Sequence, residues 1–191
     1  MGSEAEQVWQ PCCFSWSILS STVFMNESAL VDPTLWQVPA DPITPDNFQP
    51  FGQVISASRD GQAFGVQDAQ LSLEQGIPRF YIMRLQHRGR RFSRITRHLQ
   101  CTQCLGSLEG KPWLLAVAPP GDAARPHPSD IQAFEIPGNC FVKLALGTWH
   151  AGPYFDAESV DFYNLELSDT NENDHDTCDL QKSYGLVLEI S

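Results

Sequence analysis

The amino-acid sequence predicts a mainly all-β fold: an antiparallel barrel or jelly roll with one or two short helices. Short apolar segments recur along the chain, and strong turn-forming sequences such as Asp60-Gly61 and Pro137-Gly138-Asn139 separate them. The 191 residues are 42% apolar and include 14 Pro and 13 Gly, which suits one globular domain with a sizeable core and many turns. Many short strands at such spacing are typical of closed or two-sheet β architectures.

Residues 1–36 are predicted to form a flexible N-terminal extension, and residues 37–191 a single domain. The extension mixes Ser, Asn and Glu with scattered aromatics and shows no sustained helical or strand period. Its first residues carry acids where a secretory signal needs Lys or Arg, and no apolar run approaches the roughly 20 residues that cross a bilayer. We therefore expect a cytoplasmic protein without a membrane anchor.

The elements of the domain follow in order from Pro42. A short helical turn is expected first, because Thr44 is a good N-cap and Pro45 suits the first helical position. Apolar, β-prone segments between breakers then predict strands. These strands are Val54–Ile55, Arg79–Leu85, Phe92–Leu99, Trp113–Ala118, Ile131–Ile136, Phe141–Leu146 and Asp161–Leu167.

Charge and cysteine content exclude several classes of protein. The net charge of -11 repels nucleic acid and anionic membranes, so neither is an expected partner. Six irregularly placed cysteines do not read as a disulfide framework, and we expect reduced thiols. The C-x-x-C of Cys101 and Cys104 lacks the second pair that a zinc ribbon needs, which favours buried thiols.

Residues 169–179 form an acidic stretch that suggests a calcium loop. The spacing of an EF-hand fails, because Asp174 stands where Gly is required and Leu180 where the closing Glu belongs. We predict a solvated acidic loop instead.

Two short segments carry the candidate chemistry: Thr96-Arg97-His98, followed by Gln103, and Gly147-Thr148-Trp149-His150. On a strand, Thr96 and His98 point to one face and Arg97 to the other. Gln103 lies beyond an expected turn and can fold back over the same face. A barrel can therefore bring the imidazoles of His98 and His150 and one amide to the mouth of a single cavity, a site for a small polar anion.

Six arginines lie between residues 84 and 97 of this acidic chain, and most of them suit an exposed, solvated hairpin. Arg97 and Lys143 are the better candidates for binding a carboxylate, because they flank the two histidine segments. The remaining histidines, His87, His127 and His175, look like surface or loop residues. No nucleophile elbow, P-loop or dinucleotide-binding motif is present in the sequence, which disfavours the commonest hydrolases and nucleotide-binding proteins.

At these residues the sequence resembles a known family. Residues 43–55, ITPDNFQPFGQVI, are similar to the opening signature of the ureidoglycolate lyases, also called ureidoglycolate hydrolases. Residues 96–108 resemble the family's E-R-H-P…Q-x-F-x-P-L segment, residues 113–119 its strand ending in V-A-P, and residues 147–150 its G-V-W-H. The resemblance spans roughly residues 42 to 168.

The resemblance implies a cupin, a double-stranded β-helix barrel that is usually a homodimer. It implies a C–N lyase of allantoin and purine catabolism that cleaves ureidoglycolate, a small carboxylate, into glyoxylate and urea. The family's catalytic His and Gln carry over to His98, Gln103 and His150, and its Arg to Arg97. Lys143 joins Arg97 as a candidate for the substrate carboxylate, and the two histidines are assigned the acid and base roles in an undetermined order.

The sequence departs from the family pattern in its acidic and amide residues. Thr96 replaces the family's Glu, and Lys143 and Ala145 stand where Asn and His are expected. A divalent metal on His98, Gln103 and His150 would lack a carboxylate ligand, so no cofactor is assigned and the metal stays an open alternative. Two other functions stay open with it: a cupin that only binds a small carboxylate, and a metal-dependent cupin acting on another small carboxylate or sugar acid.

Overall fold

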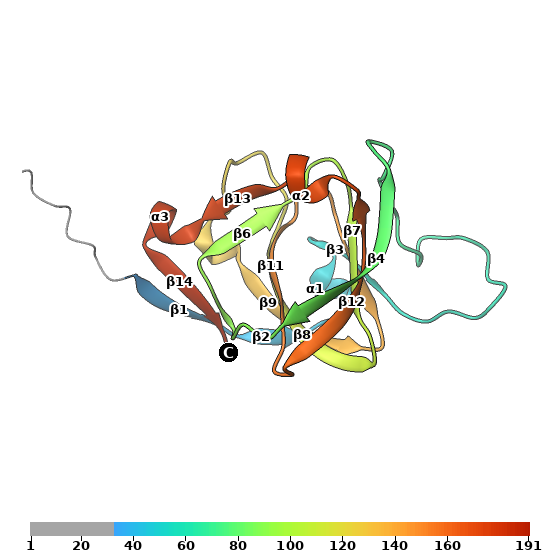
Figure 1. The fold of residues 1–191 in the computed structure, drawn as a ribbon, viewed down its shortest axis with the longest axis horizontal. Coiled ribbons are helices and arrows are strands. Elements are labelled where there is room, and N and C mark those ends of the chain that lie inside the picture. The colour runs from blue at the N-terminus through green and yellow to red at the C-terminus, as the bar shows by residue number, and fades with distance from the viewer. Residues whose placement is uncertain (1–32) are drawn as a thin grey trace, which may run out of the picture. The chain divides into compact units, whose positions relative to one another are not determined.

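The computed structural model describes residues 33–191, and the expected all-β barrel is confirmed in this part of the chain (Figure 1). Two sheets form the barrel walls. The six-stranded sheet has the order β13 (Asp176–Asp179), β6 (Arg94–Arg97), β11 (Trp149–Tyr154), β8 (Gly110–Ala118), β9 (Gln132–Gly138) and β2 (Ala40–Pro42). The five-stranded sheet has the order β3 (Gly52–Ile55), β10 (Phe141–Leu144), β7 (Gln103–Ser107), β12 (Ser159–Leu167) and β4 (Pro78–Gln86).

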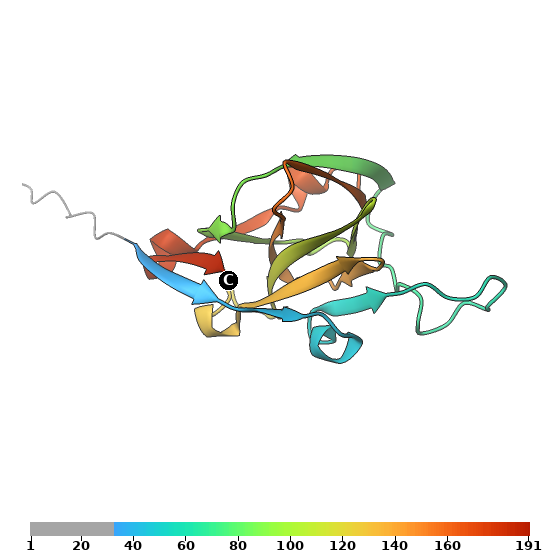
Figure 2. The same cartoon turned by 90° about the horizontal axis from the view of Figure 1, so that it is seen from below.

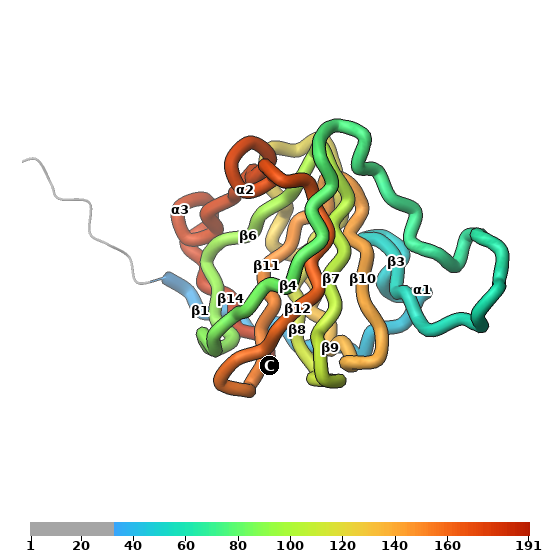
Figure 3. The backbone as a smooth tube through the Cα atoms, turned by 45° about the vertical axis from the view of Figure 1, so that its right-hand side comes forward, coloured from blue at the N-terminus to red at the C-terminus, as the bar shows by residue number. Residues whose placement is uncertain are grey.

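A third, small sheet joins β1 (Thr34–Val38), β14 (Leu186–Ile190) and β5 (Arg91–Phe92). Helices are short: α1 (Pro45–Phe48), α2 (Thr170–Asn173), α3 (Leu180–Tyr184) and the 3-10 turn Pro128–Asp130. Figure 2 shows β1 and β2 following one another along one side of the barrel. The connection between β3 and β4 extends away from the barrel, and the tube view shows β4, β12, β7 and β10 side by side (Figure 3).

Alternation along β8 divides the apolar side chains between two cores. Its residues Trp113, Leu115 and Val117 pack inside the barrel, whereas Leu114 and Ala116 join a second cluster on the outer face. The inner core also contains Leu105, Val142 and Phe162 from the five-stranded sheet, and Phe48, Phe51 and Phe134 meet within it. The outer cluster packs the six-stranded sheet against β14 and α3. Because both faces of β8 are covered, its run of apolar residues is buried throughout.

The helical turn at residues 45–48 begins as the sequence predicts. The Thr44 side chain accepts a hydrogen bond from the Asn47 backbone, and the Asn47 side chain accepts one from the Thr44 backbone, which completes a capping box. The C-x-x-C prediction is also confirmed, since Cys101 and Cys104 are buried and free. Burial raises the pKa of the Cys104 thiol to about 11, so this thiol stays protonated and unreactive at neutral pH.

The predicted solvated loop at residues 169–179 is wrong. This segment forms α2 and then β13, which pairs antiparallel with β6, and Asp174 is buried. The predicted strand over residues 92–99 is split at Ser93 into β5 and β6, and β6 ends at Arg97. Of the predicted extension, residues 34–36 lie in β1, and residues 1–32 lie outside the described residues. Within residues 33–191, no helix has both the length and the apolar character that crossing a membrane requires.

Candidate active site

The two imidazoles that the sequence singles out meet inside the barrel. His150 on β11 is paired with Thr96 on β6, and His98 follows the end of β6. The Gly147 amide donates a hydrogen bond to the His98 carbonyl at 2.7 Å, which fixes the two segments together. The ring centroids of His98 and His150 lie 5.0 Å apart with a tilt of 54°, so the expected juxtaposition is confirmed.

Backbone carbonyls set the tautomer of both rings. His98 Nδ1 contacts the carbonyl oxygen of Asp174, and His150 Nδ1 contacts that of Thr148 at 3.3 Å. A carbonyl oxygen only accepts, so Nδ1 carries the hydrogen in each neutral ring and Nε2 keeps its lone pair. The Asp174 carboxylate accepts hydrogen bonds from two backbone amides directly after His98, at 2.7 and 2.8 Å, and so holds this turn in place.

Burial keeps both rings neutral. It lowers the pKa of His150 to about 3, and the neighbouring His98 adds to the effect. Burial also lowers the pKa of His98, but the Asp174 carbonyl and the charge of Glu166 oppose this shift. His98 is therefore the stronger base of the two, and both rings enter a reaction at neutral pH as proton acceptors.

The low pKa of His150 predicts a loss of stability in acid. The unfolded chain takes up a proton near the ordinary histidine pKa of about 6.5, whereas the folded protein does so only near 3, so the unfolded state binds more protons between these values. The contribution of neutral His150 to the free energy of unfolding should be complete above pH 6.5. It should fall as the pH drops toward 3, by up to about 1.4 kcal/mol for each pH unit. Urea titrations across this range should show a shallower slope for His150→Gln than for the wild type. An unchanged slope would contradict the assignment.

A buried polar network covers the opposite wall of the barrel. Gln103 on β7 donates from Nε2 to Glu166 on β12 at 2.9 Å, and Tyr81 on β4 donates to the other Glu166 oxygen at 3.1 Å. Asn164 donates to the Tyr81 hydroxyl at 3.0 Å. Glu166 is only 1% exposed, and its charge acts on His98. The structure thus supplies a carboxylate near the histidines although Thr96 lacks one.

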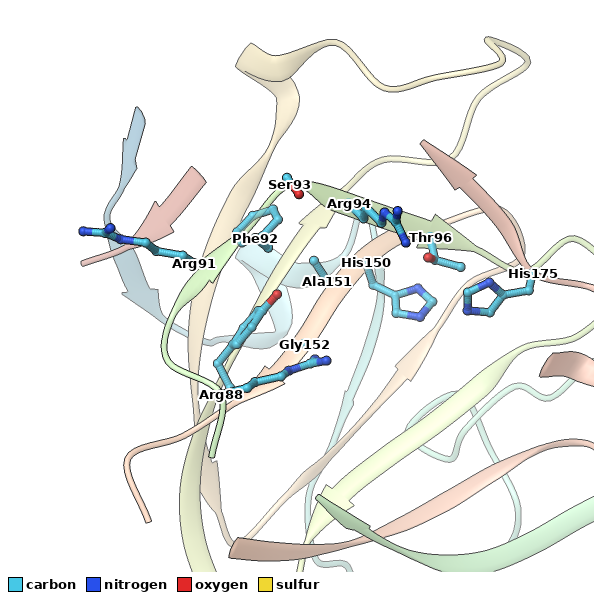
Figure 4. Close-up of a pocket in the computed structure, with 11 residues that line it drawn as sticks. Arg88, Arg91, Phe92, Ser93, Arg94, Thr96, His150, Ala151, Gly152 and His175 are labelled. Atoms are coloured by element: carbon cyan, nitrogen blue, oxygen red, sulfur yellow. The ribbon is translucent and has the colours of Figure 1, made fainter. Parts of the chain in front are cut away.

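A pocket of about 380 Å³ opens beside His150. Figure 4 shows His150 and His175 pointing toward one another across it, with Arg88 reaching in from the other side. The His175 ring lies 5.9 Å from that of His98. The pocket is lined by Arg88, Arg91, Phe92, Ser93, Arg94, Thr96, His150, Ala151, Gly152, Tyr154 and His175.

Three arginines make the pocket positive in an acidic protein, and they differ in their partners. Arg91 pairs with Glu189 at 2.8 Å, and Arg94 lies 3.9 Å from Asp179. Arg88 has no carboxylate partner among the described residues; its guanidinium lies 4.9 Å from the centre of the Tyr154 ring. Arg88 is therefore the pocket arginine with a charge still available to an anion.

The structure does not bring Arg97 to the histidines. Its side chain lies on the outer face of the six-stranded sheet, where its Nε donates to Asp176 at 2.8 Å. Nη1 donates to the carbonyls of Gly121 and Ala123, and the guanidinium carbon lies over the Trp149 ring, 4.4 Å from its centre. These contacts occupy the guanidinium, so Arg97 acts as a support of the wall that carries His150.

Lys143 also lies away from the histidines. Its neighbours Val142 and Leu144 belong to the inner core, so strand alternation places Lys143 on the outer face of the five-stranded sheet, beside Cys104. Burial lowers the pKa of Lys143. The sequence misses Arg88, His175 and Glu166, although Glu166 does occupy an inward position of the predicted strand 161–167.

The interior does not offer the ligands of a metal centre. In residues 33–191, no group of three or more His, Cys, Asp or Glu side chains is arranged to hold a metal ion. Gln103 turns its Nε2 donor toward Glu166, which leaves two imidazole lone pairs and one amide oxygen. The nearby Glu166 carboxylate already accepts a hydrogen bond on each oxygen, so this set lacks the free carboxylate that a divalent cation prefers, and the chemistry below uses side chains alone.

Comparisons with known proteins point to one family. A family model described as ureidoglycolate lyase matches residues 36–186 of the chain. A curated protein of Azotobacter vinelandii (strain DJ / ATCC BAA-1303), described as ureidoglycolate lyase, is 27% identical over 122 residues. The match covers 58% of this chain and 72% of that relative.

Proposed function

The chain belongs to the ureidoglycolate lyase family, and on that basis we propose that it releases urea and glyoxylate from ureidoglycolate. The observation that carries the proposal is the pair of imidazoles 5.0 Å apart, each with Nδ1 bound to a carbonyl and Nε2 left as an acceptor. Ureidoglycolate carries a hydroxyl, a ureido nitrogen and a carboxylate on one carbon. A base inside the barrel can take the hydroxyl proton, an amide can bind the ureido group, and a cation can bind the carboxylate.

The reaction begins with His98 as the base. Its Nε2 takes the hydroxyl proton, the O–H electrons form the C=O of glyoxylate, and the C–N bond breaks toward nitrogen. His150 does not take the acid role expected from the sequence for one of the two histidines, because its pKa of about 3 leaves it without a proton to donate at neutral pH. It accepts a hydrogen bond from the substrate instead. The departing nitrogen takes up a proton and leaves as urea. His175, exposed at the mouth, lies where a proton from solvent can reach that nitrogen.

The remaining two groups orient the substrate. Arg88 binds the carboxylate from the pocket wall. Gln103 is not among the residues that line this pocket, and its buried Oε1, which has no hydrogen-bond partner within residues 33–191, accepts a hydrogen bond from the ureido group. Both contacts hold the reacting carbon beside the histidines, so that the substrate hydroxyl meets the base in a productive orientation.

The test is glyoxylate release from ureidoglycolate by the purified full-length protein. We expect release above the spontaneous rate, and we expect it to survive treatment with a chelator. Binding of ureidoglycolate without release would support the alternative of a small-carboxylate-binding cupin. Release that the chelator abolishes would support the metal-dependent alternative.

Replacing Arg88 by methionine tests the carboxylate contact. A charge-assisted hydrogen bond contributes about 1.5–3 kcal/mol, so the KM for ureidoglycolate should rise roughly 10- to 100-fold with a smaller change in kcat. The matched control is Arg84→Met, which removes the same charge from an exposed arginine paired with Asp161 outside the pocket. Equal KM values for the two variants would remove Arg88 from the site.

A further inference from the structure

Glu166 contacts Gln103, and the proposed reaction gives this contact no role. A carboxylate accepts hydrogen bonds, and Glu166 meets Gln103 through the amide nitrogen at 2.9 Å. The amide is thereby turned so that Oε1 points away from the carboxylate. Gln103 Oε1 is buried and has no hydrogen-bond partner within residues 33–191.

We propose that Glu166 is a positioning residue that makes the site selective for a ureido group, by holding Gln103 with its carbonyl oxygen toward the substrate. The proposal rests on the proposed function, since it concerns how the same substrate is recognised. A ureido group ends in an NH₂ donor, which an amide oxygen accepts. An N-acyl analogue ends in a methyl group at that place and leaves the buried oxygen without a partner.

The surroundings of Glu166 keep the carboxylate from turning. Tyr81 donates to its second oxygen at 3.1 Å, and Asn164 donates to the Tyr81 hydroxyl at 3.0 Å. The Arg79 guanidinium lies 3.7 Å from the centre of the Tyr81 ring and covers this end of the network. With both Glu166 oxygens occupied, the Gln103 amide has one orientation that satisfies its nitrogen.

An unsatisfied buried acceptor is what makes such a site selective. A buried hydrogen-bond acceptor in a protein discriminates strongly against a ligand that offers it no donor, whereas an apolar contact discriminates weakly. With Gln at position 166, two amides face each other, and either can turn because each carries both a donor and an acceptor. The preference for an NH₂ donor is then lost while the volume of the side chain is kept.

The experiment compares glyoxylate release from ureidoglycolate and from its N-acetyl analogue, in which a methyl group replaces the terminal NH₂. Both compounds yield the same product, so one assay gives both kcat/KM values. We expect the wild type to prefer ureidoglycolate by about 100-fold, and Glu166→Gln to reduce this ratio about 10-fold or more, chiefly through KM. A ratio unchanged within about 2-fold of the wild-type value overturns the proposal.

Tyr81→Phe is the matched control, because it removes the other hydrogen bond to the same carboxylate and leaves the Gln103 contact in place. Because Tyr81 also restrains this carboxylate, the variant should lower the ratio by less than Glu166→Gln does, whereas a purely structural role of Glu166 would lower the ratio equally in both variants. Should Glu166→Gln fail to fold, Gln103→Leu carries the test, because it removes the amide itself and should abolish the preference. A wild-type protein that releases no glyoxylate would refute the proposed function, and an active wild type with unaffected ratios refutes only this inference.

Discussion

Replacement of His98 by asparagine is expected to lower kcat for glyoxylate release by about 10²- to 10⁴-fold, the range that one general base contributes. Asparagine keeps a nitrogen donor for the Asp174 carbonyl and so preserves the turn that follows residue 98. It removes the Nε2 lone pair that faces the interior. The loss should therefore appear in kcat, with a smaller change in KM.

Steady-state kinetics with ureidoglycolate measure this effect, and thermal unfolding shows whether the variant is folded. The control is His127→Asn, which changes a histidine in the 3-10 turn region, outside the candidate site, and retains an N-cap side chain there. It should keep the wild-type kcat. If His98→Asn also kept it, His98 would not be the base.

Replacing Trp149 by alanine should produce the largest loss of stability, about 3–5 kcal/mol in the free energy of unfolding. The indole is 1% exposed, packs in the outer cluster and lies under the Arg97 guanidinium. Its removal leaves a cavity directly behind the strand that carries His150. The variant should also lose activity at temperatures where it is still folded.

Urea titration of Trp149→Ala gives the stability change, and activity at low temperature gives the effect on the site. Trp36→Ala is the control, because that side chain is 42% exposed on β1 and should cost less than about 1 kcal/mol. Equal losses for the two variants would contradict the role of the outer cluster as a support for the site.

Strand periodicity accounts for the part of the site that the sequence could predict. Residues two positions apart on a strand share a face, so the alternation from Thr96 predicted that His98 points into the barrel. The turn before Gln103 predicted that the Gln103 side chain points into the same interior. The same alternation placed Arg97 on the opposite face, where it is found. Arg97 was nevertheless a candidate for binding the substrate carboxylate, because it is next to His98 in the sequence. The prediction failed because adjacent residues of a strand point to opposite faces.

The remaining site residues depend on contacts between distant segments. Arg84, Arg90 and Arg91 are paired with acids 66 to 98 positions away, and these pairings leave Arg88 without a carboxylate among the described residues. Nothing in the local sequence distinguishes Arg88 from its neighbours. The acidic composition of residues 169–179 favoured a loop, yet the exposed edge of β6 needs a partner, and β13 supplies it. The homodimer and the cytoplasmic location stay predictions.

The most direct measurement is a crystal structure of the protein with a stable analogue of ureidoglycolate in which a CH₂ group replaces the nitrogen bonded to the reacting carbon, so that the hydroxyl is kept and no C–N bond can break. The account predicts the ligand in the pocket beside His150, with its carboxylate on Arg88, its hydroxyl donating to His98 Nε2 and its terminal NH₂ group donating to Gln103 Oε1. A ligand bound on the outer face at Arg97 or Lys143, with the two histidines untouched, would contradict it.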